Sequence, residues 1–182
     1  MRILSIAEHA AWLAASDLAA RPYVEGGGTF RFYLQFHAPT TFRATECFTE
    51  GILEYAATEG EVLLTVVNVV MPYDYEERLF DKIRRASNAP IPTDDSGGHL
   101  FTADERRDSI PVFSLTAGWQ WEVYLHMPHS RTVLLNWEGA IFDLWTDDES
   151  VLSGVFEMLE RFGLTETEGS KSKRARRNGG GV

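Results

Sequence analysis

The chain has 182 residues, the length of one globular domain, and 44% of them are hydrophobic and 12% aromatic. This composition excludes intrinsic disorder for most of the chain, and a single cysteine excludes a disulfide scaffold. The net charge is −10, and because residues 165–182 carry five basic and two acidic side chains, residues 1–164 carry −13. A body of this charge repels nucleic acid and anionic membranes and attracts basic partners, although solubility alone also explains it.

The first half of the chain predicts two helices and two strands. Ser5 and Glu8 form a capping box in front of an amphipathic helix. Alternating apolar and polar residues over 30–36 predict a half-buried strand. A run of β-branched residues over 62–71 predicts a central strand, and it is too short to span a membrane. Apolar residues at helical spacing over 74–87 predict the second helix.

Two further segments have mixed signals. Residues 41–58 place three apolar residues at helical spacing, but a glycine and four threonines weaken a helix there. Residues 88–111 contain three prolines and two adjacent glycines and are predicted to form a loop. A loop of this length inside a compact domain is usually functional or mobile.

The C-terminal part of the chain predicts a β-meander followed by a helix. Strands are expected over 119–126, 131–137 and 140–145. Thr146 and Glu149 form a second capping box, and an amphipathic helix follows it. Strands in succession, with the helices apart from them, indicate the α+β class.

The predicted architecture is therefore one α+β domain over residues 1–164. Its sheet is mainly antiparallel, ends in the C-terminal meander and is flanked by about three to four helices. Residues 165–182 are polar and basic and are predicted to be a disordered tail.

The register of the meander decides which side chains share a face. A two-residue turn at Glu138-Gly139 would place the apolar residues of the last two strands in one layer, namely Val133, Leu135, Trp137, Ala140, Phe142 and Leu144. The strand before them joins this layer only if its connecting loop has an odd number of residues. A four-residue loop is disfavoured because it would bury Glu122.

The opposite face of the meander would combine acidic, aromatic and amide side chains, including Gln120, Glu122, Tyr124, His126, Asn136, Asp143 and Trp145. Carboxylates steer a basic partner toward such a surface, and aromatic rings supply contact area. The predicted partner-binding residues are Glu122, Tyr124, Asp143 and Trp145 together with the helix start at Asp147, Asp148 and Glu149. Two alternatives remain open: other elements cover this face, and the helix-start acids serve the helix dipole.

No spacing of residues forms a catalytic or metal-binding motif. His126 and His129 are separated by two residues across a turn, unlike the helical histidine pair of a zinc protease. Glu122 and Asp143 would form a glycosidase-like carboxylate pair only inside a deep cleft, and Cys47 has no activating context. We therefore predict no catalytic residue, no metal and no cofactor.

We expect no targeting signal in either terminal segment of the sequence. Acidic and polar residues interrupt the apolar stretch after Arg2, so we expect no signal peptide and a cytoplasmic protein. The basic residues 170–177 lack interleaved aromatic rings, so we expect a solvated tail and no nucleic-acid partner.

A small, acidic, tryptophan-rich α+β protein of this kind resembles the immunity proteins that neutralise bacterial polymorphic toxins. The resemblance rests on two acidic-aromatic runs, residues 137–145 and 147–149. It implies a non-enzymatic inhibitor that binds one cognate toxin, often a basic nuclease, and blocks its active site or the approach of its substrate. The basic tail departs from this picture.

The alternative function is a small hydrolase or transferase. Its site would lie under residues 88–111 and would use His99, Asp94 or Asp95. A pocket of several hundred Å³ under that segment would favour the enzyme, and a flat acidic face would favour the inhibitor.

Overall fold

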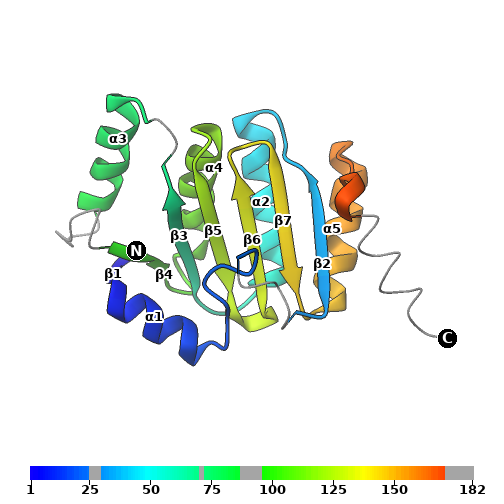
Figure 1. Cartoon of the computed structure of the whole chain (residues 1–182), viewed down its shortest axis with the longest axis horizontal. Coiled ribbons are helices and arrows are strands. Elements are labelled where there is room, and N and C mark those ends of the chain that lie inside the picture. The colour runs from blue at the N-terminus through cyan, green and yellow to red at the C-terminus, as the bar shows by residue number, and fades with distance from the viewer. Residues whose placement is uncertain (25–29, 70–71, 87–95, 171–182) are drawn as a thin grey trace.

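A single antiparallel sheet organises the molecule (Figure 1). The computed structural model describes residues 1–24, 30–69, 72–86 and 96–170. Seven strands in the described residues pair in the order β1-β4-β3-β5-β6-β7-β2. They are β1 (Arg2–Ser5), β2 (Phe32–His37), β3 (Val62–Asn68), β4 (Ser96–Phe101), β5 (Glu122–Met127), β6 (Thr132–Trp137) and β7 (Ile141–Thr146). The α+β class and the C-terminal meander β5-β6-β7 are confirmed.

Five α-helices pack around this sheet in the described part of the chain, one more than the upper end of the predicted range. They are α1 (Ile6–Ala15), α2 (Phe42–Ala56), α3 (Asp74–Arg85), α4 (Ser109–Gly118) and α5 (Glu149–Phe162). The capping box of α1 is present, because Glu8 N–H donates to Ser5 Oγ and Ser5 N–H donates to Glu8 Oε2. The ambiguous segment 41–58 is helical, and the side chain of Thr41 caps α2.

The loop predicted over 88–111 is wrong at residues 96–101 and 109–111, which belong to a strand and a helix. Residues 96–101 form β4, where Gly97 lies so close to α1 that an added Cβ would be 2.4 Å from Cβ of His9. Pro111 is in the first turn of α4, where a backbone N–H has no intrahelical acceptor, so the proline does not break the helix. A proline and a glycine pair that indicated a loop therefore belong to regular elements.

Both faces of the sheet are buried. Behind it in Figure 1 lie α2, α4 and α5, and this side holds the larger hydrophobic cluster. In front, α1 and the segment that follows it cover a second apolar cluster, made of Leu4, Leu13, Leu18, Phe30, Leu63, Leu100, Tyr124, Val133, Leu135 and Trp145. Of the alternatives left open for the second face of the meander, the one in which other elements cover it is correct.

The predicted register of the meander is also wrong. Trp137 pairs with Ile141, so the connection from β6 to β7 has three residues, with Glu138 and Gly139 both at positive φ. The connection from β5 to β6 has four residues, because Met127 pairs with Thr132. As a result Val133 and Leu135 lie on the same face as Asp143 and Trp145. Residues 133–135 are all apolar, so alternation within β6 could not decide between the two registers.

The segment after α5 is ordered beside the sheet. Residues 165–167 pair with the outer edge of β2 and residues 168–170 are helical, although residues 165–182 were expected to be a disordered tail. The folded unit therefore includes residues 165–170. Residues 171–182, which hold all five basic side chains of the predicted tail, lie outside the described residues.

Candidate partner-binding surface

Three of the residues proposed for partner binding are in the interior. Tyr124 and Asp143 are 0% exposed and Trp145 is 3% exposed. The side of the sheet that carries them is covered by α1 and the segment after it, so no partner can reach them in this fold. The prediction that these three residues lie at the surface is wrong, because this second apolar layer buries them.

Asp143 belongs to an internal hydrogen-bond network. Its Oδ1 accepts from Tyr33 Oη at 2.6 Å and from Gln35 Nε2 at 2.8 Å. Burial, and then the hydrogen bond to Asp143, raise the pKa of Tyr33. A carboxylate held in this way joins β7 to β2, because the pairs Gln35–Asp143 and Tyr33–Trp145 are neighbours across the two strands.

The remaining predicted acids lie at the rim of the sheet and at the start of α5. Glu122 is half-buried, and burial raises the pKa of its carboxyl group. Asp147 accepts the backbone N–H of Arg31 at 2.7 Å and forms an ion pair with Arg131 at 3.2 Å. Asp148 is the N-cap of α5, and Glu149 is exposed. Asp147 and Asp148 thus stabilise the fold locally.

Of the three residues proposed for the alternative enzyme, the structure describes His99 alone. His99 is 2% exposed with its ring against Phe80, and burial lowers its pKa to about 4. Two hollows of about 150 and 180 Å³ occur among the described residues, and His99 lines neither of them. Both are smaller than the roughly 300–1,000 Å³ typical of ligand sites. Asp94 and Asp95 lie outside the described residues.

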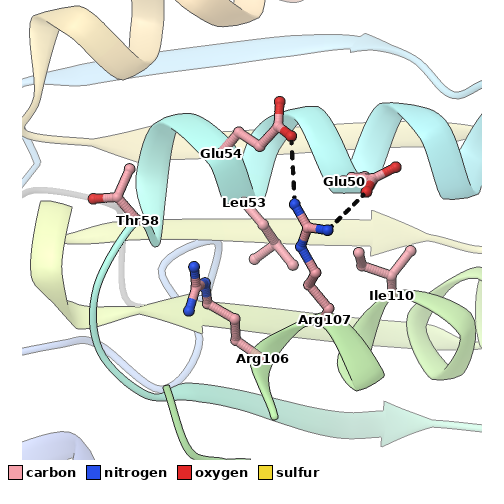
Figure 2. Close-up of a pocket in the computed structure, with 7 residues that line it drawn as sticks. All are labelled: Glu50, Leu53, Glu54, Thr58, Arg106, Arg107 and Ile110. Atoms are coloured by element: carbon pink, nitrogen blue, oxygen red, sulfur yellow. Dashed lines mark ion pairs between the residues drawn. The ribbon is translucent and has the colours of Figure 1, made fainter. Parts of the chain in front are cut away.

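The smaller hollow lies between α2 and the turn before α4 (Figure 2). Arg107 forms ion pairs with Glu50 and Glu54, each at 3.8 Å, and all three side chains are substantially exposed. Exposed ion pairs of this length contribute about 0–1 kcal/mol. The ion pairs of Arg107 hold the turn before α4 against α2, and they need no bound ligand to explain them.

The two histidines of the H-x-x-H spacing face different surroundings. His126 is buried with Nε2 at 3.3 Å from the carbonyl oxygen of Ala20, whereas His129 is exposed. Within the described ranges, no three His, Cys, Asp or Glu side chains gather as metal ligands would. None of the helices described has the length and apolar character needed to cross a bilayer.

An acidic and aromatic surface does occur, at the start of α3. Three large hydrophobic side chains are exposed there, Tyr73 by 67%, Tyr75 by 56% and Leu79 by 40%. Asp74 and Glu77 are exposed beside them. We call these five residues the tyrosine surface of α3.

A buried carboxylate positions both tyrosines. Glu76 is 4% exposed, and its Oε2 accepts the backbone N–H of Tyr73 at 3.1 Å. Its Oε1 accepts the hydroxyl of Tyr75 at 3.1 Å, and this bond raises the pKa of Tyr75. The two tyrosine rings stack with their centroids 5.7 Å apart and an interplanar angle of 13°. The aromatic part of the surface is therefore ordered before any partner binds.

The opposite side of α3 anchors the helix on the sheet. Phe80 packs edge-on against His99 and Trp121, with ring centroids 5.2 and 5.3 Å away. Figure 1 shows α3 at the end of the molecule remote from α5. The apolar positions of α3 spread over about half of its circumference. Of these positions, the side of Phe80 is covered and the side of Tyr75 is exposed. The breadth of this apolar face is the feature of the sequence that indicates an apolar side left uncovered.

Comparison with known protein families, with curated proteins and with solved structures finds no match to this chain.

Proposed function

We propose that the protein is a non-enzymatic, protein-binding inhibitor of the immunity type, which binds a basic partner through the tyrosine surface of α3. The observation that carries the proposal is the pair of stacked, exposed tyrosines held by buried Glu76. Tyrosine is enriched among the residues that dominate binding energy at protein interfaces. The proposal includes a cytoplasmic location and a toxin as the partner.

The charge around the tyrosines favours a basic partner. Asp74 and Glu77 flank the rings in the first turn of α3, and the first basic residue after them is Arg78, which is also exposed. The chain as a whole carries −10. Complementary charge raises the rate of association and disfavours partners of like charge.

The rigidity of the surface favours tight binding. A side chain that must be ordered on binding costs about 0.5–1.5 kcal/mol. Tyr75 is already held by Glu76, so much of this cost is absent when a partner docks.

The experiment begins with capture of a partner on the immobilised full chain, followed by purification of the candidate toxin. Titration calorimetry then compares the wild type with Tyr75→Ala and Glu77→Lys. We expect Tyr75→Ala to weaken binding by about 2 kcal/mol, or roughly 30-fold, if the ring is an anchor. Glu77→Lys should slow association, most strongly at low salt. The wild-type chain should also suppress the toxic activity at a one-to-one ratio.

Glu160→Lys is the matched control. It makes the same charge reversal at an exposed position of α5, at the opposite end of the molecule. It should bind the partner as the wild type does. Equal affinity of Tyr75→Ala, Glu77→Lys and the wild type would overturn the assignment of the surface. Binding without any effect on the partner's activity would overturn the inhibitor.

A further inference from the structure

The outer edge of β2 is paired with a segment that is not a strand of the sheet. We call residues 165–170 the strap: Glu166 forms an antiparallel bridge with Phe36 of β2, and residues 168–170 are helical. The backbone N–H of His37 donates to the carbonyl of Thr165 and the N–H of Thr167 donates to the carbonyl of Gln35, both at 3.0 Å. The N–H of Gln35 donates to Ser170 Oγ at 3.1 Å, so a side chain replaces the carbonyl that a full strand would offer.

The strap is held by polar contacts alone. Its sequence, Thr-Glu-Thr-Glu-Gly-Ser, has no apolar side chain, and Ser170 is its one buried residue. Segments with few buried apolar contacts open at lower free energy than the core they cover. β2 pairs with β7 on one side and with the strap on the other. Of these two neighbours, the strap is therefore the more easily displaced.

The edge beneath the strap is a good template for a strand. Phe32, Leu34 and Phe36 alternate along β2 toward the helices, while Gln35 and His37 direct their N–H groups outward to the strap. An edge of this kind pairs readily with any extended chain that reaches it. Strand addition to a sheet edge is a recurrent mode of peptide recognition.

One side-chain contact adds selectivity to this edge. The hydroxyl of Thr167 donates to Gln35 Oε1 at 2.7 Å, which orients the amide so that Nε2 donates to Asp143. A strand with a hydroxyl at this position satisfies the acceptor that a strand with an apolar residue would leave unsatisfied.

We propose that the outer edge of β2 is a peptide-binding site, occupied in this chain by its own strap. The ligand it fits is an extended peptide that runs antiparallel to β2 and carries Thr or Ser opposite Gln35. A partner strand of this chemistry displaces the strap and adds to the sheet. The proposal rests on β2 and the strap and is independent of the tyrosine surface.

The test uses the full chain with Thr167→Pro, which removes the N–H that donates to Gln35 and the hydroxyl that orients its amide. Thr167→Ser is the matched control, because it keeps both the backbone N–H and a hydroxyl at this position. The probe is a fluorescent synthetic peptide with the sequence of residues 164–170, titrated by anisotropy.

We expect Thr167→Pro to bind the peptide saturably and at least tenfold more tightly than the wild type or Thr167→Ser. A peptide with proline in place of Thr167 should not bind. Absence of peptide binding by folded Thr167→Pro would overturn the proposal. Light scattering that shows a dimer of Thr167→Pro, without peptide binding, would also overturn the proposal. The edge would then accept a second copy of this chain.

Hydrogen exchange on the wild type tests the same idea without a variant. The amides of Gln35 and His37, which face the strap, should exchange at least tenfold faster than those of Leu34 and Phe36, which face β7. Equal protection of the two sets would show that the strap opens only with the whole domain, and would contradict a displaceable cap.

Discussion

Tyr33 donates a 2.6 Å hydrogen bond from its phenol to the buried carboxylate of Asp143 on the neighbouring strand. Gln35 donates to the same oxygen at 2.8 Å, and the strap in turn donates to Gln35. This polar network lies on the face of the sheet that the acidic and aromatic pattern of β7 had indicated as a binding surface. The same residues that suggested a partner are instead partners of one another.

The first prediction follows from the burial of Asp143. Asp143→Lys should destabilise the protein by more than about 3 kcal/mol, because it buries an unpaired cation in place of a hydrogen-bonded carboxylate. Tyr33→Phe should cost about 1–3 kcal/mol, because one hydrogen bond to a charged group is lost. Urea unfolding measures both. Glu160→Lys, an exposed charge reversal, should stay within about 0.5 kcal/mol, and a similar value for Asp143→Lys would contradict its burial.

The second prediction concerns acid. Burial lowers the pKa of both His99 and His126 to about 4 in the folded protein. An unfolded histidine titrates near 6.5, so between these values the unfolded chain binds protons that the folded chain does not. The free energy of unfolding should therefore be unaffected by these groups above pH 6.5 and should decrease as the pH falls toward 4.

Between pH 7.5 and pH 5 the combined decrease should be roughly 4 kcal/mol, from about 1.4 kcal/mol per pKa unit for each histidine. Denaturant unfolding at several pH values provides the measurement. Replacing His126 with leucine should reduce the slope by about half. A wild-type stability that is flat across this range would show that neither histidine is held neutral by the fold.

The third prediction compares two helical glycines. A Cβ on Gly154 would lie 2.6 Å from ring atoms of Tyr55 where α5 crosses α2, whereas a Cβ on Gly118 would meet nothing within 4 Å. Gly118→Ala should leave stability unchanged or raise it by up to about 1 kcal/mol through helix propensity. Gly154→Ala should lower it by about 1–3 kcal/mol, because the ring must move. Thermal melts of both variants measure the difference. Equal melting midpoints would argue against the close contact between Gly154 of α5 and Tyr55 of α2.

The fourth prediction separates the two sides of α3. Phe80→Ala should cost about 3–5 kcal/mol, because the buried ring packs against His99 and Trp121. Tyr73→Ser should change stability by less than about 1 kcal/mol, because that ring is 67% exposed. Chemical denaturation of the two variants provides the comparison. A large loss for Tyr73→Ser would mean that the ring supports the fold and is not available to a partner.

Local patterns predicted most of the regular elements. The capping box of Ser5 and Glu8 correctly marked the start of α1, and the periodicity of residues 74–87 correctly marked α3. Helix α4 was not predicted, because Pro111 in its first turn is also typical of a loop. The proposed binding surface failed for a different reason. Alternation shows that two sets of side chains face opposite ways, but it does not say what covers each set.

The amino-acid sequence by itself determined the α+β class, the acidic charge and the meander, because composition and periodicity are properties of the chain alone. Only the tertiary structure decided which surfaces are free. Burial of Asp143 depends on the pairing of β7 with β2, which brings Tyr33 and Gln35 onto its carboxylate, and exposure of Tyr73 and Tyr75 depends on how far α3 stands from its neighbours. The strap likewise covers β2 through contacts about 130 residues apart in sequence. Long-range packing of this kind leaves no periodic signal in the strands that it covers.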